Sequence, residues 1–274
     1  MTHKIVTLAD SSALAVHLSG WKKDLPDTRD FMLKSLASVL PGAKLNRPSS
    51  VDNSKKCSKI EDQGALGSCT AQMLVGMVEY NNIRWSVPKP SRKQISRLFE
   101  YYATRKIMGT LNEDSGAYIR DAIKAAALYG CVWESKWKYD VSKFTLEPEQ
   151  KVWDTAATHK IVSYHRINDG DLETMKQTLA SGYLIGFGFE VYSNFTSQQM
   201  ATEGVLHLPG PNDQVEGGHA VVLVGYDDVR GAFKVRNSWG PSWGQAGYFW
   251  MDYGYVGNGN LSNDFWVVNS VSVV

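Results

Sequence analysis

Cysteine is scarce in this chain, which carries three thiols, Cys57, Cys69 and Cys131, in 274 residues. Three cysteines are too few for a disulfide framework, and such thiols are commonly buried in reduced form. A Cys57–Cys131 pair stays open at this stage, since the sequence does not give the separation of the two α-carbons. The scarcity is consistent with a reducing compartment.

Excess charge of either sign is also lacking. The 29 basic and 28 acidic side chains leave a formal net charge of +1, which gives no electrostatic case for nucleic acid or a membrane surface as a partner. No nucleic-acid-binding motif is found. Histidine and cysteine are too scattered for a zinc signature, and no motif for an organic cofactor is found. We therefore expect neither a metal nor a cofactor.

Long apolar runs are absent as well. No segment of the sequence approaches the roughly 20 apolar residues of a membrane span. The run Ile5–Asp10 near the N-terminus is too short and too polar for the apolar core of a secretory signal. The default expectation is a cytoplasmic protein with no membrane partner, and export by another route stays open.

The length and the 43% hydrophobic content suit one large soluble domain or two compact lobes. Residues 1–49 contain turn-forming proline clusters and none of the catalytic candidates described below, which predicts an N-terminal arm or short pro-segment. Residues 50–155 are predicted to form a mainly helical lobe. Residues 156–274 are predicted to form a β-rich lobe.

Hydrophobic periodicity supports this division. Apolar residues between Met73 and Val78 recur at helical spacing, which predicts a buried helix beginning near Thr70 with Ser68 as its N-cap. Further helices are expected over residues 98–108, 119–129 and 171–181, and strands over 161–164, 183–191, 220–226 and 233–235.

The run from Gln63 to Thr70 places a thiol at the predicted start of this helix. Cys69 would lie where the helix dipole puts partial positive charge, which favours a thiolate. Gly64 and Gly67 leave room for the backbone to approach a substrate carbonyl. These features favour a nucleophilic Cys69 over a buried structural thiol.

Two further motifs supply the partners that a nucleophilic thiol requires. His219 follows a Gly-Gly pair and precedes a hydrophobic strand, so its imidazole could be held rigidly beside the thiol. Asn237 would orient that imidazole, and Trp239 would shield the hydrogen bond between them. Gln63 and the backbone N–H of Cys69 would stabilise an oxyanion. The other histidines lack such a setting and are expected to be ordinary surface or core residues: His3, His17, His159, His165 and His207.

These three motifs, at positions 63–69, 218–221 and 237–249, resemble those of the papain-like cysteine peptidases, in particular a small bacterial or viral branch. His219 follows Cys69 by 150 residues and Asn237 follows it by 168, at or just beyond the roughly 130–150 typical of the family. The resemblance implies an α+β fold of two lobes, one helical and one β-barrel-like, with the active site in the cleft between them. It also implies peptide-bond hydrolysis through a thioester. An endopeptidase is favoured over an exopeptidase because nothing in the sequence resembles a cleft-blocking insertion, although the N-terminal arm could serve as one.

The resemblance implies the substrate-binding residues too. The run Asp114–Ala117 stands where the family has half of a disulfide, and Leu66 replaces the other half, so that disulfide is absent. Gly116 and Ala117 would pair with an extended substrate as an added strand. Gly67 would border the scissile bond and Trp243 the leaving group. The full set implied is Gly67, Ser68, Gly116, Ala117, Gly218, Trp239 and Trp243. Residues 252–264 would form the floor of a specificity pocket, and an apolar substrate side chain is the family expectation there.

Several alternatives stay open from the sequence. The same triad could serve an amide acyl-transferase or deamidase, and the same fold could serve as a non-catalytic binding module. Residues 1–49 could restrain activity or could be a permanent structural wrap. The expected partners are a peptide or protein substrate and proteinaceous cysteine-protease inhibitors, and a monomer is expected.

Overall fold

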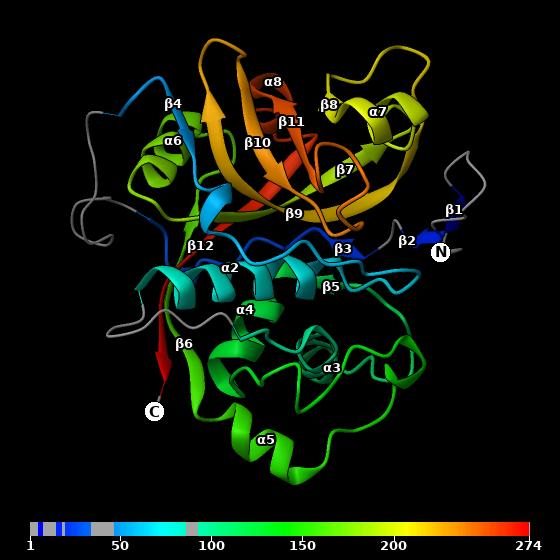
Figure 1. The fold of residues 1–274 in the computed structure, drawn as a ribbon, viewed down its shortest axis with the longest axis vertical. Coiled ribbons are helices and arrows are strands. Elements are labelled where there is room, and N and C mark those ends of the chain that lie inside the picture. The colour runs from blue at the N-terminus through cyan, green and yellow to red at the C-terminus, as the bar shows by residue number, and fades with distance from the viewer. Residues whose placement is uncertain (1–4, 8–14, 18–19, 34–46, 86–92, 274) are drawn as a thin grey trace.

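The computed structural model describes residues 5–7, 15–17, 20–33, 47–85 and 93–273. Figure 1 shows a mainly helical half of the molecule and a half built on a large sheet, which carries helices of its own. The helices are α2 (Cys69–Trp85), α3 (Arg97–Met108), α4 (Ile119–Leu128), α5 (Gln150–Ala156), α6 (Leu172–Ala180), α7 (Gln198–Glu203) and α8 (Tyr253–Val256), with 3-10 turns at Ser54–Lys56 and Val141–Lys143. The strands are β1 (Ile5–Thr7), β2 (Ala15–His17), β3 (Trp21–Lys22), β4 (Ser50–Asp52), β5 (Ala117–Tyr118), β6 (His159–Ile167), β7 (Ile185–Tyr192), β8 (Val205–Leu206), β9 (Val215–Asp227), β10 (Ala232–Arg236), β11 (Tyr248–Asp252) and β12 (Ser262–Val273).

Helix α2 is the central helix of the molecule, and it lies between the sheet and helices α3, α4 and α5 (Figure 1). The predicted apolar stripe is present, but the helix is buried on nearly all sides over residues 69–83, as expected for a helix enclosed by packed layers. On the sheet side, Gly186 of β7 lets it approach closely, since a Cβ there would lie 2.1 Å from the Met73 sulfur. This packing fixes the first residue of α2 against the sheet.

The main sheet has eight strands, seven of them in the order β6-β12-β7-β9-β10-β11-β8, and β4 pairs with β9. The α+β class is confirmed. Among the described strands the path ends at β6 and β8, so the sheet is open rather than closed into a barrel. Antiparallel pairing predominates, and the β8–β11 pair is parallel. The sheet supplies β9, which carries His219, and β10, which Asn237 directly follows.

All three cysteines are free, so Cys57 and Cys131 do not form a disulfide. Leu66, which stands where the resemblance places a disulfide cysteine, packs in a buried cluster with Tyr101 and Ala117. Among the described residues, no helix has the length and apolar character needed to cross a bilayer.

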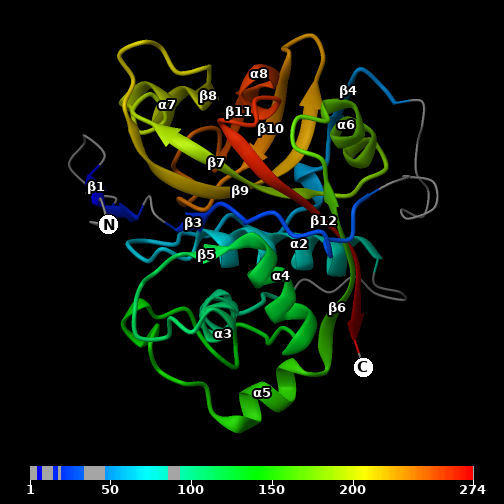
Figure 2. The same ribbon diagram turned by 180° about the vertical axis from the view of Figure 1, so that it is seen from behind.

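Residues 20–33 form an extended segment, here called the strap, at the boundary between the two halves. Figures 1 and 2 show β3 and β5 along this boundary from opposite sides. Strand β3 of the strap pairs with β5 in parallel register, Trp21 with Ala117 and Lys22 with Tyr118. Further along, the strap exchanges backbone hydrogen bonds with Arg166 of β6. The remaining residues of the predicted arm include 1–4, 8–14, 18–19 and 34–46, which lie outside the described residues.

Candidate active site

Cys69 is the first residue of α2 and is fully buried. Its thiol accepts a backbone hydrogen bond from Ala220, the neighbour of His219, so the helix start and β9 meet at the sulfur. Burial nevertheless raises the pKa of Cys69 to about 12. With the site covered, the Cys69 thiol is therefore neutral. Its position at the start of α2 favours the thiolate, but the thiolate forms only when water reaches the site.

His219 and Asn237 form the second part of the site. Asn237 Oδ1 lies 2.8 Å from His219 Nε2 and also accepts the backbone N–H of Ser238 at 2.8 Å. Since two donors converge on this oxygen, Nε2 carries a proton, and Nδ1 presents its lone pair. Nδ1 has no hydrogen-bond partner among the described residues. Burial lowers the pKa of His219 to about 4, so the imidazole is neutral here.

Trp239 covers this pair as the sequence predicts. Its ring centroid lies 5.0 Å from that of His219, and it packs at 5.2 Å against Trp243. Both indoles are almost fully buried. The two rings thus keep water away from the His219–Asn237 hydrogen bond.

Gln63 joins the helical half to the sheet half at the same point. Its Oε1 accepts from the Ser238 hydroxyl at 2.7 Å, its backbone N–H donates to Ser238 O at 2.9 Å, and its Nε2 donates to Leu66 O at 3.1 Å. An amide nitrogen carries two protons. The second N–H and the backbone N–H at the start of α2 are the two donors suited to an oxyanion.

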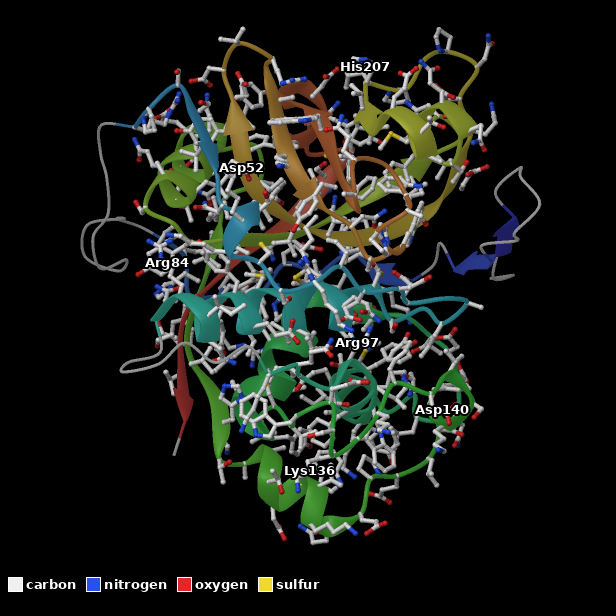
Figure 3. The ribbon with its side chains drawn as sticks, viewed as in Figure 1. Asp52, Arg84, Arg97, Lys136, Asp140 and His207 are labelled. Atoms are coloured by element: carbon white, nitrogen blue, oxygen red, sulfur yellow. The ribbon has the colours of Figure 1, made fainter. Side chains whose placement is uncertain are left out.

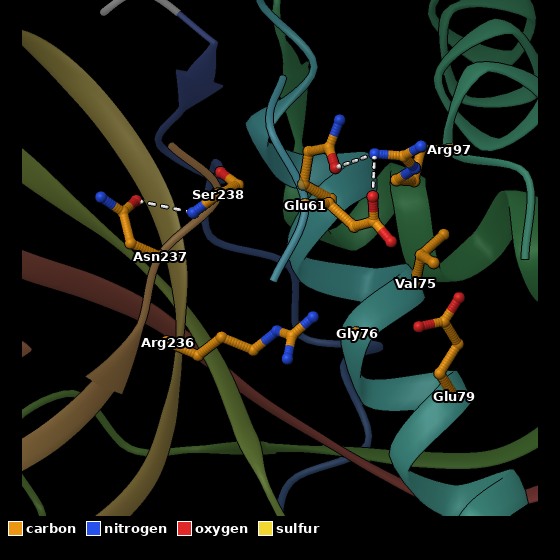
Figure 4. Close-up of a pocket in the computed structure, with 9 residues that line it drawn as sticks. Glu61, Val75, Gly76, Glu79, Arg97, Arg236, Asn237 and Ser238 are labelled. Atoms are coloured by element: carbon orange, nitrogen blue, oxygen red, sulfur yellow. Dashed lines mark hydrogen bonds and ion pairs between the residues drawn. The ribbon is translucent and has the colours of Figure 1, made fainter. Parts of the chain in front are cut away.

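A polar cavity lies behind this network. Figure 4 shows Arg97 reaching Glu61, an ion pair of 3.0 Å, with Asn237 and Ser238 on the opposite wall. Arg236 also lines the cavity and donates to the backbone oxygens of residues 58 and 59. These charged groups fix the loop that carries Gln63 against the strand that carries Asn237.

The predicted substrate edge is present and is occupied by the strap. The Gly67 N–H donates to the Asp114 carboxylate at 3.0 Å. This hydrogen bond joins the two loops that a disulfide would connect in the papain-like peptidases that the sequence resembles. Gly116 adopts a φ of +65°, and its N–H bonds the hydroxyl of Tyr101. The next N–H, of Ala117, bonds Gly20 O of the strap at 2.9 Å.

The strap lies directly over the nucleophile. A Cβ at Gly20 would lie 2.6 Å from Cys69 Sγ and 2.9 Å from Gly67 O, so only glycine fits at this position. The strap therefore covers the thiol.

Buried ion pairs anchor the strap further along. Asp30 forms two hydrogen bonds of 2.7 Å with Arg120, and an ion pair of 3.2 Å with Arg166. Asp24 accepts from the Trp266 indole at 3.2 Å, and its own N–H donates to Asp264 at 2.8 Å. Burial, with repulsion from Asp264, raises the pKa of Asp24 to about 7.

The structure brings the predicted catalytic residues together and separates other candidates from them. Ser68 lies just before α2, but its hydroxyl contacts the Tyr139 hydroxyl at 2.7 Å instead of capping the helix. Figure 3 places His207 at the sheet end of the molecule, far from α2, where it pairs with Asp252 at 3.0 Å. His159 bonds Asn82 and His165 bonds Asn269.

Sequence reasoning missed the residues that hold the strap. They are Gly20, Trp21, Asp24, Asp30, Arg120, Arg166, Gly188 and Asp264. None belongs to a recognisable motif. Asp264 lies in the predicted pocket floor of residues 252–264, but its contacts with the strap were not predicted. A signal could have come from the concentration of aspartates in residues 24–30, which requires cationic partners elsewhere once these residues are buried.

Comparisons with known proteins agree with this geometry. A family model described as papain family cysteine protease matches residues 47–268. The chain belongs to this family. It is 36% identical to an uncharacterised peptidase C1-like protein of Acanthamoeba polyphaga mimivirus, over 92% of this chain and 87% of that relative. It is also 28% identical to cysteine proteinase 3 of Dictyostelium discoideum, over 77% of this chain, which spans 62% of that relative's length.

The structure is similar to that of xylellain, a cysteine protease from Xylella fastidiosa, with a TM-score of 0.83 and 37% identity. The match covers 92% of this chain and 96% of xylellain. The bacterial and viral resemblance of the sequence motifs is thereby confirmed. The papain-family protein described here is a peptide hydrolase of the cysteine type.

Proposed function

We propose that this papain-family protease is an endopeptidase that the strap holds in an inactive form. The observation that carries the proposal is the position of Gly20, at which a Cβ would lie 2.6 Å from Cys69 Sγ. The strap also uses the Ala117 N–H that a substrate strand would need. A substrate can enter this edge only after residues 20–33 leave it.

The chemistry starts when the cleft is uncovered. Access of water removes the burial that raises the pKa of Cys69 and lowers that of His219, so the thiol proton moves to His219 Nδ1. The thiolate attacks the substrate carbonyl, and the backbone N–H of Cys69 and the Gln63 amide hold the oxyanion. His219 then gives its proton to the leaving amine, and water hydrolyses the thioester. Asn237 keeps Nδ1 directed at the reaction centre throughout.

Labelling with an irreversible thiol-directed epoxide tests this proposal in the Asp30→Asn chain, in which an anchor of the strap is weakened, with the modified residue located by mass spectrometry. We expect Cys69 to be modified and Cys57 and Cys131 to remain unmodified. His219→Ala should abolish the reaction because no imidazolium then stabilises the thiolate. Cleavage of a peptide amide should yield the free acid without an added amine. Strict dependence on an added amine would instead support a transferase, and a folded Asp30→Asn protein that neither labels nor cleaves would contradict the proposal.

A further inference from the structure

The strap places one large side chain, Trp21, in a pocket beside the thiol. A Cβ at Gly188 would lie 2.0 Å from Trp21 Cε2, and one at Gly218 would lie 2.8 Å from Trp21 Cε3. In the β7–β9 register Gly188 faces Ala220 and Glu190 faces Gly218, so both glycines lie on the same face of the sheet. We call the space bounded by Gly188, Gly218 and Asp264 the indole pocket.

Asp264 forms the floor of the indole pocket. Its side chain is fully buried, and its Oδ2 accepts the Trp21 Nε1–H at 3.2 Å. The residue adopts a φ of +61°, and the β7–β12 register is irregular between Asn263 and Trp266. Such a bulge redirects a side chain, and a strained backbone of this kind is concentrated at functional sites.

The body of the protein holds the Asp264 carboxylate in one orientation. Arg166 donates to Oδ1 at 2.8 Å, and the Asp264 N–H donates to Asp169 at 3.1 Å. Oδ2 faces the strap, from which it accepts the Trp21 indole and the Asp24 backbone N–H. When the strap leaves, these two donors leave with it, and a buried acceptor without a donor is costly.

From this geometry, and resting on the proposed peptidase function, we infer that the indole pocket selects substrates with a large side chain that ends in an N–H donor, tryptophan before all others. Asp264 is the specificity-determining residue. Because Gly188 and Gly218 carry no side chain, the pocket is wide enough for an indole ring. Arg166 already occupies the other oxygen of Asp264, which disfavours a second cation such as a substrate arginine. This selection differs from the apolar preference that the family resemblance implies.

The matched probes are peptides that contain tryptophan or 3-benzothienylalanine, in which a sulfur atom replaces the indole N–H at nearly the same size. Each is placed in turn at the three residues before the scissile bond of otherwise identical fluorogenic peptides. The enzyme is the full-length chain with Asp30→Asn, which weakens the strap. At one position we expect kcat/KM to favour tryptophan by about tenfold or more, the effect of a hydrogen bond to a charged acceptor.

Two variants sharpen the result. In Asp264→Asn, Arg166 draws the amide oxygen toward itself, so the amide N–H₂ faces the pocket and the tryptophan preference should fall to about one. Asparagine tolerates the left-handed backbone at this position. Gly188→Ala narrows the pocket instead, so it should slow cleavage of both aromatic peptides relative to a valine peptide and leave their ratio intact. Should Asp264→Asn fail to fold, Gly188→Ala and the probe pair decide the outcome.

Equal cleavage of the two aromatic peptides at all three positions would overturn the inference and leave the proposed function standing. A preference for valine or leucine over both would overturn it in the same way. If no peptide is cleaved by a protein whose Cys69 labels, the endopeptidase proposal itself fails, and the inference fails with it.

Discussion

The catalytic network and the strap interface are held together by different kinds of interaction. Neutral hydrogen bonds join Gln63, Ser238, Asn237 and His219, and all four belong to the body of the protein. Buried carboxylates and guanidinium groups join the strap to the body, as in the Asp30–Arg120 pair. Changes in charge at the strap interface therefore act on the cover of the cleft, whereas the hydrogen bonds between the reacting groups themselves involve no charged side chain.

The largest effect should come from breaking the neutral network. Gln63→Ala removes an oxyanion donor, and we expect kcat to fall by about 10²–10³. The measurement is kcat on a fluorogenic peptide with the strap weakened by Asp30→Asn. Ser238→Ala is the control, because it removes the hydroxyl that positions Gln63 Oε1 and keeps the donor, so its loss should be much smaller. Equal losses in both variants would show that Gln63 acts only through packing.

An effect of intermediate size on the reactivity of Cys69 is expected from breaking the ion pairs between the strap and the body of the protein. Asp30→Asn removes the carboxylate that pairs with both Arg120 and Arg166, and breaking such a buried pair is strongly destabilising. We expect Cys69 to react with the epoxide about 10–100 times faster than in the unchanged chain. Asp27→Asn is the matched control, since Asp27 pairs with the exposed Arg29 and exposed pairs contribute little. Equal rates for the two variants would contradict the anchoring role of Asp30.

The smallest effect concerns pH. The pKa of Asp24 is raised from 3.8 to about 7, chiefly by burial, so the closed state binds a proton that the unfolded chain releases. Closure is accordingly favoured at acid pH, and this stabilisation is lost as pH rises from about 4 to about 7.

Calorimetric unfolding at several pH values tests the predicted loss of stability as pH rises. Asp24→Asn should flatten the fall in Tm between pH 5 and pH 8 by a few degrees. Asp27→Asn should leave that slope unchanged, because the pKa of Asp27 is lowered by its hydrogen bonds with Arg29 and the group does not titrate in this window. An Asp24→Asn slope equal to that of the unchanged chain would exclude the coupling.

The contrast between the catalytic network and the strap interface also explains what could be predicted from the sequence. Cys69, His219 and Asn237 stand in motifs whose spacing is readable, and helix α3 and strand β9 follow from local periodicity. Trp21 and Asp264 are 243 residues apart and meet only through the fold. Their partnership has no local signal, since an isolated tryptophan or aspartate has many ordinary roles. The open sheet likewise depends on long-range pairing that periodicity does not specify.

The most direct measurement uses an engineered disulfide that holds the strap in place and can be reduced. Lys22 and Tyr118 are register partners in the β3–β5 pair, and the Lys22 ammonium lies 5.9 Å from the centre of the Tyr118 ring. Cysteines at both positions should therefore form a disulfide across this pair. In the Asp30→Asn background, we predict that the oxidised Lys22→Cys/Tyr118→Cys chain neither cleaves peptide nor labels at Cys69, and that reduction restores both, with the Asp30→Asn chain that lacks the two cysteines taken through the same steps as reference. Equal activity in the oxidised and reduced forms would contradict the claim that the strap controls the site.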